Sequence, residues 1–237
     1  MNQYDYKYQT PPPSPLATGS ASLVSSTMKR VYVKMFLGLL VTAFTAMYAA
    51  STSFINFYIT HSWLMWVLMI AEFGMVIAIS GAINKLSSAT ATLLFYLFAI
   101  VNGLMLSTIF VVYAPGAIAK TFFITAGTFG AMSIYGYFTN SDLTKWGAFF
   151  FMALIGLIIA SVVNLFVHSS GLDWIVSIVG VLLFVGLTAW DTQQIKRMAM
   201  VSGVENQGKL ATYGALSLYL DFINLFIYLL RIFGNRN

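Results

Sequence analysis

Charge and cysteine are what this sequence has least of. Only 8% of its 237 residues are Asp, Glu, Lys or Arg, and it contains no cysteine. Soluble domains carry about 25% charged residues, because their surfaces must be hydrated. A chain with so few charges is therefore not a water-soluble enzyme. The absence of cysteine excludes disulfides, thiolate metal ligands and cysteine nucleophiles.

Proline is also scarce outside one short region. Four of the five prolines lie between residues 11 and 15, among Ser, Thr, Tyr and Gln. This composition predicts a disordered, partly polyproline cytoplasmic arm over residues 1–31, followed by a membrane domain over residues 32–233 and a short tail over residues 234–237. The net charge of +5 arises from short clusters between apolar runs. The chain therefore offers no basic face for nucleic acid.

Apolar residues make up 59% of the chain, and its mean hydropathy is +0.83. A helix needs roughly 20 apolar residues to cross a hydrocarbon core of about 30 Å. The apolar runs are long and unbroken, without the alternating ten-residue pattern of a membrane barrel. The sequence predicts an all-α membrane protein, a bundle of seven transmembrane helices. The seven runs cover about residues 32–53, 63–83, 90–113, 117–138, 146–167, 174–198 and 211–233.

Lys and Arg are distributed unequally between the two sides of this predicted bundle. Nine of the 12 fall in the arm and in connections on the N-terminal side, and three fall on the opposite side. Cytoplasmic segments of membrane proteins are enriched in basic residues. The count therefore predicts an N-terminus in the cytoplasm and a C-terminus outside.

Two acidic residues are predicted to meet in the cytoplasmic half of the bundle. Asp191 lies about one and a half turns inside the edge of the sixth span, and Asp221 lies ten residues into the seventh, which starts from the same side. Two acids in a low-dielectric site tend to share a proton and titrate as a unit. Such a pair can sense pH, bind a cation or perform acid–base chemistry. Alternatively, each acid caps a helix or pairs with a nearby base, such as Lys196 or Arg197 beside Asp191.

Polar residues form one stripe along the seventh span. Ser217, Asp221, Asn224 and Tyr228 follow the i, i+4, i+7, i+11 spacing of a single helix face. A polar stripe in a membrane must face protein or water. We therefore expect the last helix to be central, with the other six packed around it.

Glu72 is a third acid at membrane depth, in the middle of the second span. A charge at the centre of a span costs about 2.5–3.5 kcal/mol on insertion scales, so it is seldom idle. Arg231 ends the seventh span about 15 Å beyond Asp221. An interhelical Glu72–Arg231 ion pair would neutralise both charges; the alternative is that each side chain snorkels separately to the membrane surface.

The sequence resembles the Bax inhibitor-1 proteins, also called the transmembrane Bax-inhibitor-motif family, over residues 28 to 233. Three segments carry the resemblance: Ser-Ile-Tyr-Gly-Tyr at 133–137, Ala-Trp-Asp-Thr-Gln at 189–193 and Ala-Leu-Ser-Leu-Tyr-Leu-Asp-Phe-Ile-Asn-Leu-Phe at 215–226. It is most similar to the bacterial members, which have seven helices with the last at the centre. A bacterial inner membrane is the expected location.

The resemblance implies a pH-sensitive calcium leak, with the Asp191–Asp221 pair as its proton-operated gate. It also implies that an acid of the second span pairs with an Arg near the end of the seventh, which here are Glu72 and Arg231. Ca²⁺ and protons are then the ligands, the lipid bilayer is the surrounding partner, and no cofactor is expected. Two carboxylates fall short of a high-affinity Ca²⁺ cage, so we expect Asp191 and Asp221 to bind the ion only in passage.

Two other functions compete with an ion leak. Intramembrane aspartyl proteases also place two Asp residues on neighbouring helices, but theirs follow a Gly-x-Gly-Asp pattern and need a Pro-Ala-Leu element. Here Leu-Tyr-Leu precedes Asp221, and no proline follows Pro115. We therefore expect no enzymatic activity. The other alternative is a regulatory protein that binds a membrane partner and modulates a quality-control protease or a stress or death pathway.

Overall fold

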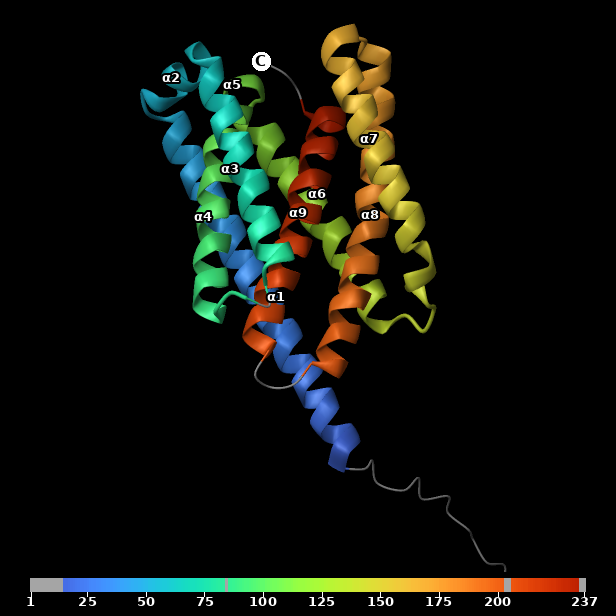
Figure 1. Ribbon diagram of the computed structural model, residues 1–237. Coiled ribbons are helices and arrows are strands. Elements are labelled where there is room, and N and C mark those ends of the chain that lie inside the picture. Colours follow the sequence, from blue (N-terminus) through green and yellow to red (C-terminus); the bar gives the residue numbers. More distant parts are fainter. Residues whose placement is uncertain (1–14, 84, 203–205, 235–237) are drawn as a thin grey trace, which may run out of the picture.

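The protein is described here from a computed structural model that covers residues 15–83, 85–202 and 206–234. Figure 1 shows that the chain is a bundle of helices running roughly along one direction. The helices are α1 (Pro15–Ala50), α2 (Phe54–Thr60), α3 (Ser62–Gly81), α4 (Ser88–Leu106), α5 (Ile109–Val112), α6 (Pro115–Phe138), the 3₁₀ helix η1 (Leu143–Trp146), α7 (Gly147–Val167), α8 (Ser170–Val201) and α9 (Gln207–Phe233).

Seven stretches of helix within the described ranges are long and apolar enough to cross a membrane. They correspond one for one to the seven predicted runs, which confirms an all-α membrane bundle. The short α5 extends the span of α4, and α2 lies in the connection between the first two spans. The seven spans are Ala21–Ala50, Ser62–Gly81, Ser88–Val112, Pro115–Phe138, Leu143–Val167, Ser170–Val201 and Gln207–Phe233.

The first helix begins much earlier than the sequence predicts. α1 starts at Pro15, so the expected disordered arm is wrong for residues 15–31; residues 1–14, and 235–237 of the predicted tail, lie outside the described ranges. The cause is a helical apolar spacing, since Val24, Met28 and Val31 are buried at i, i+4 and i+7. α1 packs against α8 and α9, which gives this apolar face its partners.

The last helix is the centre of the bundle, as predicted. α9 contacts α1, α3, α4, α6 and α8, and it lies behind α3 and between α4 and α8 in Figure 1. Leu218, Tyr219 and Leu225 are completely buried. A helix that is apolar or small-sided on most of its faces can be surrounded in this way. The polar stripe is then the one face of α9 that needs a polar environment.

Two helices stand apart from this centre. In the most apolar 18-residue stretch of α3, only 6% of the residues are buried inside the protein, and the same holds for the span that contains α7. α3 packs mainly on α4, and α7 packs mainly on α8. Most residues of α3 and α7 are therefore exposed, either at the outer surface of the bundle or in the space between the helices.

Close helix crossings fix the rest of the bundle. A Cβ atom on Gly103 of α4 would lie 2.7 Å from the Thr42 carbonyl oxygen of α1, and one on Gly136 of α6 would collide with the Ala189 backbone of α8. Small residues at crossings allow backbones in a membrane to approach closely. The Gly136 contact with Ala189 fixes the position of α8 about half a turn before Asp191.

Candidate functional site

A cavity of about 1320 Å³ lies between the helices of the bundle, and most of its lining comes from α3, α4, α7, α8 and α9. Most of the lining is apolar, but four carboxyl groups and one guanidinium also line it. An excess of acidic groups makes such a cavity attractive to cations. The charged lining residues are Glu72, Asp173, Asp191, Asp221 and Arg231.

The structure brings Asp191 and Asp221 together, as the sequence predicts. Asp191 lies on α8 and Asp221 on α9, and their carboxyl groups are in hydrogen-bonding contact. Asp221 is 4% exposed, and its Oδ2 atom has no hydrogen-bond partner among the described residues. A contact between two carboxyl groups is a hydrogen bond only when a proton lies on one of them. Such a hydrogen bond between Asp191 and Asp221 therefore requires a proton on one of the two carboxyl groups.

The basic residues near Asp191 in sequence bind elsewhere. Lys196 donates to the Tyr137 carbonyl oxygen at 2.6 Å and also lies over the Tyr137 ring. Arg197 forms an ion pair with Asp142 at 2.7 Å, in the connection before η1. The alternative pairing of Asp191 with these bases is thus absent from the part of the chain that the structure describes.

Asp142 itself lies outside the membrane spans and belongs to a surface network. Hydrogen bonds from the side chain and backbone of Thr144, together with one from Arg197, lower the pKa of Asp142. The Arg197 guanidinium also donates to the Thr144 hydroxyl. This network ties the connection between α6 and α7 to the end of α8, about two turns from Asp191.

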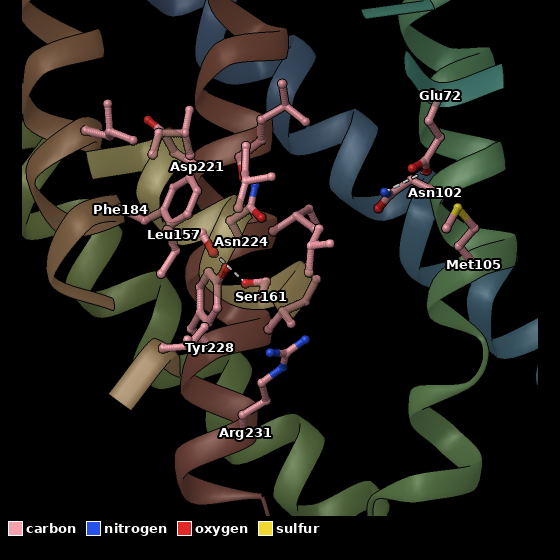
Figure 2. A pocket seen from close by; sticks show the side chains of 18 of the residues that line it. Glu72, Asn102, Met105, Leu157, Ser161, Phe184, Asp221, Asn224, Tyr228 and Arg231 are labelled. Carbon is pink, nitrogen blue, oxygen red and sulfur yellow. Dashed lines mark hydrogen bonds between the residues drawn. The ribbon is translucent and has the colours of Figure 1, made fainter. Parts of the chain in front are cut away.

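The predicted stripe on α9 faces the cavity, since Ser217, Asp221, Asn224 and Tyr228 all line it. Figure 2 shows Asp221, Asn224 and Tyr228 following one another along α9. The Asn224 side-chain amide donates to its own helix, at the Leu220 carbonyl oxygen 2.8 Å away. The Tyr228 hydroxyl contacts Ser161 of α7. The stripe thus forms a polar wall leading to the carboxyl pair.

The predicted Glu72–Arg231 ion pair is wrong, although both residues line the cavity. Glu72 Oε1 accepts a hydrogen bond from Asn102 Nδ2 at 2.8 Å, whereas Arg231 pairs with Asp173 at 3.5 Å and lies over the Tyr228 ring (Figure 2). The reason is helix adjacency. α3 packs mainly on α4, which supplies Asn102, and the end of α9 lies beside the start of antiparallel α8, which supplies Asp173.

A buried hydrogen-bond network behind Glu72 was not apparent from the sequence. The Tyr219 hydroxyl donates to Asn102 Oδ1 at 3.0 Å and lies 2.6 Å from the Thr42 hydroxyl. The network joins α1, α3, α4 and α9 through their side chains. Its one signal in the sequence is the position of Tyr219 deep inside a span, whereas membrane tyrosines concentrate at the interfaces.

Six membrane-spanning helices packed around a central seventh define a polytopic α-helical membrane protein. Comparison with known families agrees with this class. The family described as "Inhibitor of apoptosis-promoting Bax1" matches residues 24–237. The chain belongs to this Bax inhibitor family, which confirms the resemblance seen in its sequence.

Bacterial proteins are similar to the chain over nearly its whole length. Inner membrane protein YbhL of Escherichia coli strain K12 is 50% identical over 213 residues, which cover 88% of this chain and 91% of YbhL. A protein of Borreliella burgdorferi is 47% identical over 212 residues, covering 88% and 91% of the two chains. Protein RP147 of Rickettsia prowazekii is 44% identical over 210 residues, covering 88% and 89%.

Proposed function

We propose that the protein is a pH-sensitive cation leak that passes Ca²⁺, and that the Asp191–Asp221 pair is its gate. The observation that carries this proposal is the contact between two carboxyl groups at one end of an acidic cavity. In this function the Asp191–Asp221 pair catalyses no reaction. It acts through its charge and through the hydrogen bond that joins α8 to α9.

A shared proton links the state of the pair to pH. Such a proton lets the two carboxyl groups form a hydrogen bond that two ionised carboxylates could not form. The pair then holds about one negative charge near neutral pH, because the second ionisation is opposed by the first and by burial. Adding or removing a proton changes both the attraction for an entering cation and the bond between the two helices.

The site favours passage of Ca²⁺ over storage. Ca²⁺ takes six to eight oxygen ligands in proteins, and the described residues contain no cluster of three or more acidic or His side chains placed to hold a metal ion. The pair supplies two carboxyl groups, and the α9 stripe adds amide and hydroxyl groups. An ion held by so few protein ligands keeps part of its water shell and can leave again.

The test is Ca²⁺ flux into liposomes that contain the purified protein, measured across a range of pH. Wild-type flux should vary with pH, with an apparent midpoint that belongs to the pair. Asp191→Asn and Asp221→Asn each keep the shape but remove one titrating group, so each should flatten the profile or shift it by about one unit or more. Asp142→Asn, at an exposed acid outside the spans, is the matched control and should keep the wild-type midpoint.

Two outcomes would overturn this function. Flux that ignores pH, or Asp191→Asn and Asp221→Asn variants that both titrate like wild type, would exclude a shared-proton gate. Cleavage of a model membrane peptide that either substitution abolishes would instead establish an intramembrane protease.

A membrane regulator is the second candidate, and the description of the matching family as an inhibitor favours it. Such a protein would act by binding a membrane partner in a quality-control or death pathway. The two candidates separate in purified liposomes, because a leak needs no partner protein. Absence of flux there, together with partner-dependent effects in cells, would select the regulator.

We also propose that the protein lies in the bacterial inner membrane with its N-terminus in the cytoplasm. The similarity to inner membrane protein YbhL supports the location. The excess of basic residues on the N-terminal side supports the orientation. A reporter fused after Asn237 should behave as non-cytoplasmic. Cytoplasmic activity of that reporter would reverse the assignment of the C-terminus.

A further inference from the structure

The cavity ends at the carboxyl pair and does not continue through the bundle. Its lining on α8 begins at Ser170 and stops at Asp191, and its lining on α9 begins at Ser217. Among the described residues, none of α1 lines it. An ion that reaches the pair from the cavity therefore still has to cross the layer between the pair and the α8–α9 connection.

We propose that Val31 and Ile195, packed over Gly214, form an apolar seal beyond the carboxyl pair, and that this seal is the barrier limiting ion passage. The inference rests on the proposed leak and adds a second element to it. The carboxyl pair responds to protons, whereas the seal limits the rate of ion passage whether or not the pair is protonated.

Helix periodicity places the seal in line with the pair. Ile195 follows Asp191 by four residues, and Gly214 precedes Asp221 by seven. These spacings correspond to about one and two turns along the same helix faces. An ion that moved past the two carboxyl groups along these helix faces would therefore meet Ile195 on α8 and Gly214 on α9.

Three helices pack tightly together at this point. A Cβ atom on Gly214 would lie 3.0 Å from Ile195 Cγ2 and 3.1 Å from Val31 Cγ2. Val31 is 0% and Ile195 1% exposed. Val31 of α1 and Ile195 of α8 thus both pack closely against Gly214 of α9.

Buried apolar residues extend the seal toward the α8–α9 connection. From Val31 back to Val24, α1 covers about 10 Å along its axis. The same hydrophobic cluster contains side chains from α1, α8 and α9 over this stretch: Val24, Met28, Ala199, Leu210 and Ala211. A hydrated cation cannot enter such a layer without losing its water, and hydrophobic constrictions gate channels by remaining dry.

The seal predicts an effect on flux that differs from that of the pair. Shortening a seal side chain makes room for water, so flux should rise at every pH while the midpoint stays where it was. Substitutions in the pair should move the midpoint itself. The size of the flux and its pH midpoint therefore report on the two elements separately.

The decisive comparison is Ile195→Ala against Ile79→Ala, in the full-length protein in liposomes. Both isoleucines are buried core residues, with 1% and 0% of their surface exposed, but Ile79 lies on α3, a helix that contributes none of the seal residues. Loss of packing is similar in the two variants. Ile195→Ala should raise Ca²⁺ flux by about threefold or more without shifting its pH midpoint, whereas Ile79→Ala should leave flux near the wild-type level.

A second pair of variants tests the opposite change. Gly214→Ala adds a methyl group that would lie 3.0–3.1 Å from Ile195 and Val31, so these side chains would have to shift slightly, whereas Gly130→Ala adds one on α6 with no atom within 4 Å. Gly214→Ala should alter flux and Gly130→Ala should not. Lower flux in Gly214→Ala supports a tighter seal, and higher flux supports one forced apart at this point.

The outcomes keep the seal and the leak distinct. Equal flux from Ile195→Ala and Ile79→Ala, in a protein whose flux still depends on pH and on Asp221, would overturn the seal alone. Absence of flux from wild type and from Ile195→Ala at every pH would overturn the leak on which the seal depends.

Discussion

Removing the hydroxyl group of Tyr219 should destabilise the bundle measurably, because this group ties α9 to two other helices. It donates to Asn102 Oδ1 on α4 and contacts the Thr42 hydroxyl on α1. Tyr219→Phe keeps the ring, whose centroid lies 5.7 Å from that of Phe95 and 5.6 Å from that of Phe98. The substitution therefore isolates the polar contacts from the aromatic packing.

The expected cost follows from counting the bonds that are lost. The Thr42 hydroxyl has one proton for two acceptors, the Tyr219 hydroxyl and the Ala99 carbonyl oxygen, so that contact is a shared bond. The bond to Asn102 is lost in full. Interhelical hydrogen bonds in membranes average about 0.6 kcal/mol and reach about 1.7. Tyr219→Phe should lower the free energy of unfolding by about 1–2 kcal/mol.

Equilibrium unfolding by SDS in mixed micelles measures this change. Tyr96→Phe is the matched control, because Tyr96 also lies on the α4 side near Phe95 but its hydroxyl bonds to none of the described residues; it should cost less than about 0.5 kcal/mol. Combining Tyr219→Phe with Thr42→Val should cost less than the sum of the single variants. A Tyr219→Phe variant as stable as Tyr96→Phe would refute the network.

Two further predictions concern helix contacts. Gly136→Ala should cost about 1–3 kcal/mol, because its methyl group would meet the backbone of α8, whereas Gly127→Ala, with no neighbouring atom within 4 Å, should be close to neutral in the same unfolding measurement. In double-mutant cycles, Arg231→Gln should couple to Asp173→Asn by about 0.2–1 kcal/mol, since both side chains are more than a third exposed and the pair is screened by solvent. Arg231→Gln should be additive with Glu72→Gln, and strong coupling there would restore the ion pair that the structure lacks.

The length and composition of the apolar runs were sufficient to predict the spans. Backbone polar groups in lipid must be satisfied within a helix, so a long apolar run leaves little choice of structure. The polar stripe at Ser217, Asp221, Asn224 and Tyr228 was sufficient to predict a central last helix. The start of α1 was not predicted, because the average polarity of residues 1–31 conceals the regular spacing of Val24, Met28 and Val31 within them.

The two predicted side-chain pairs show what sequence can and cannot locate. Asp191 and Asp221 lie at similar depth on consecutive antiparallel helices, and consecutive helices are usually neighbours, so adjacency and depth together predict their contact. Glu72 and Arg231 lie on helices far apart in sequence. The depth of a residue does not show which helices are in contact. Glu72 pairs with Asn102 and Arg231 pairs with Asp173, each on an adjacent helix.

The helices that line the cavity differ in how much of each is covered by protein. In the most apolar 18-residue stretch of each span, 6% of the residues are buried for α3 and for α7, against 56% for α9. Their 20 and 21 residues correspond to about 30 Å of helix, close to the thickness of a bilayer core. A thinner or thicker bilayer changes the tilt of such helices at small energetic cost. Because α9 is held by protein on most sides, we expect the width of the cavity to depend on the thickness of the surrounding membrane as well as on the protein.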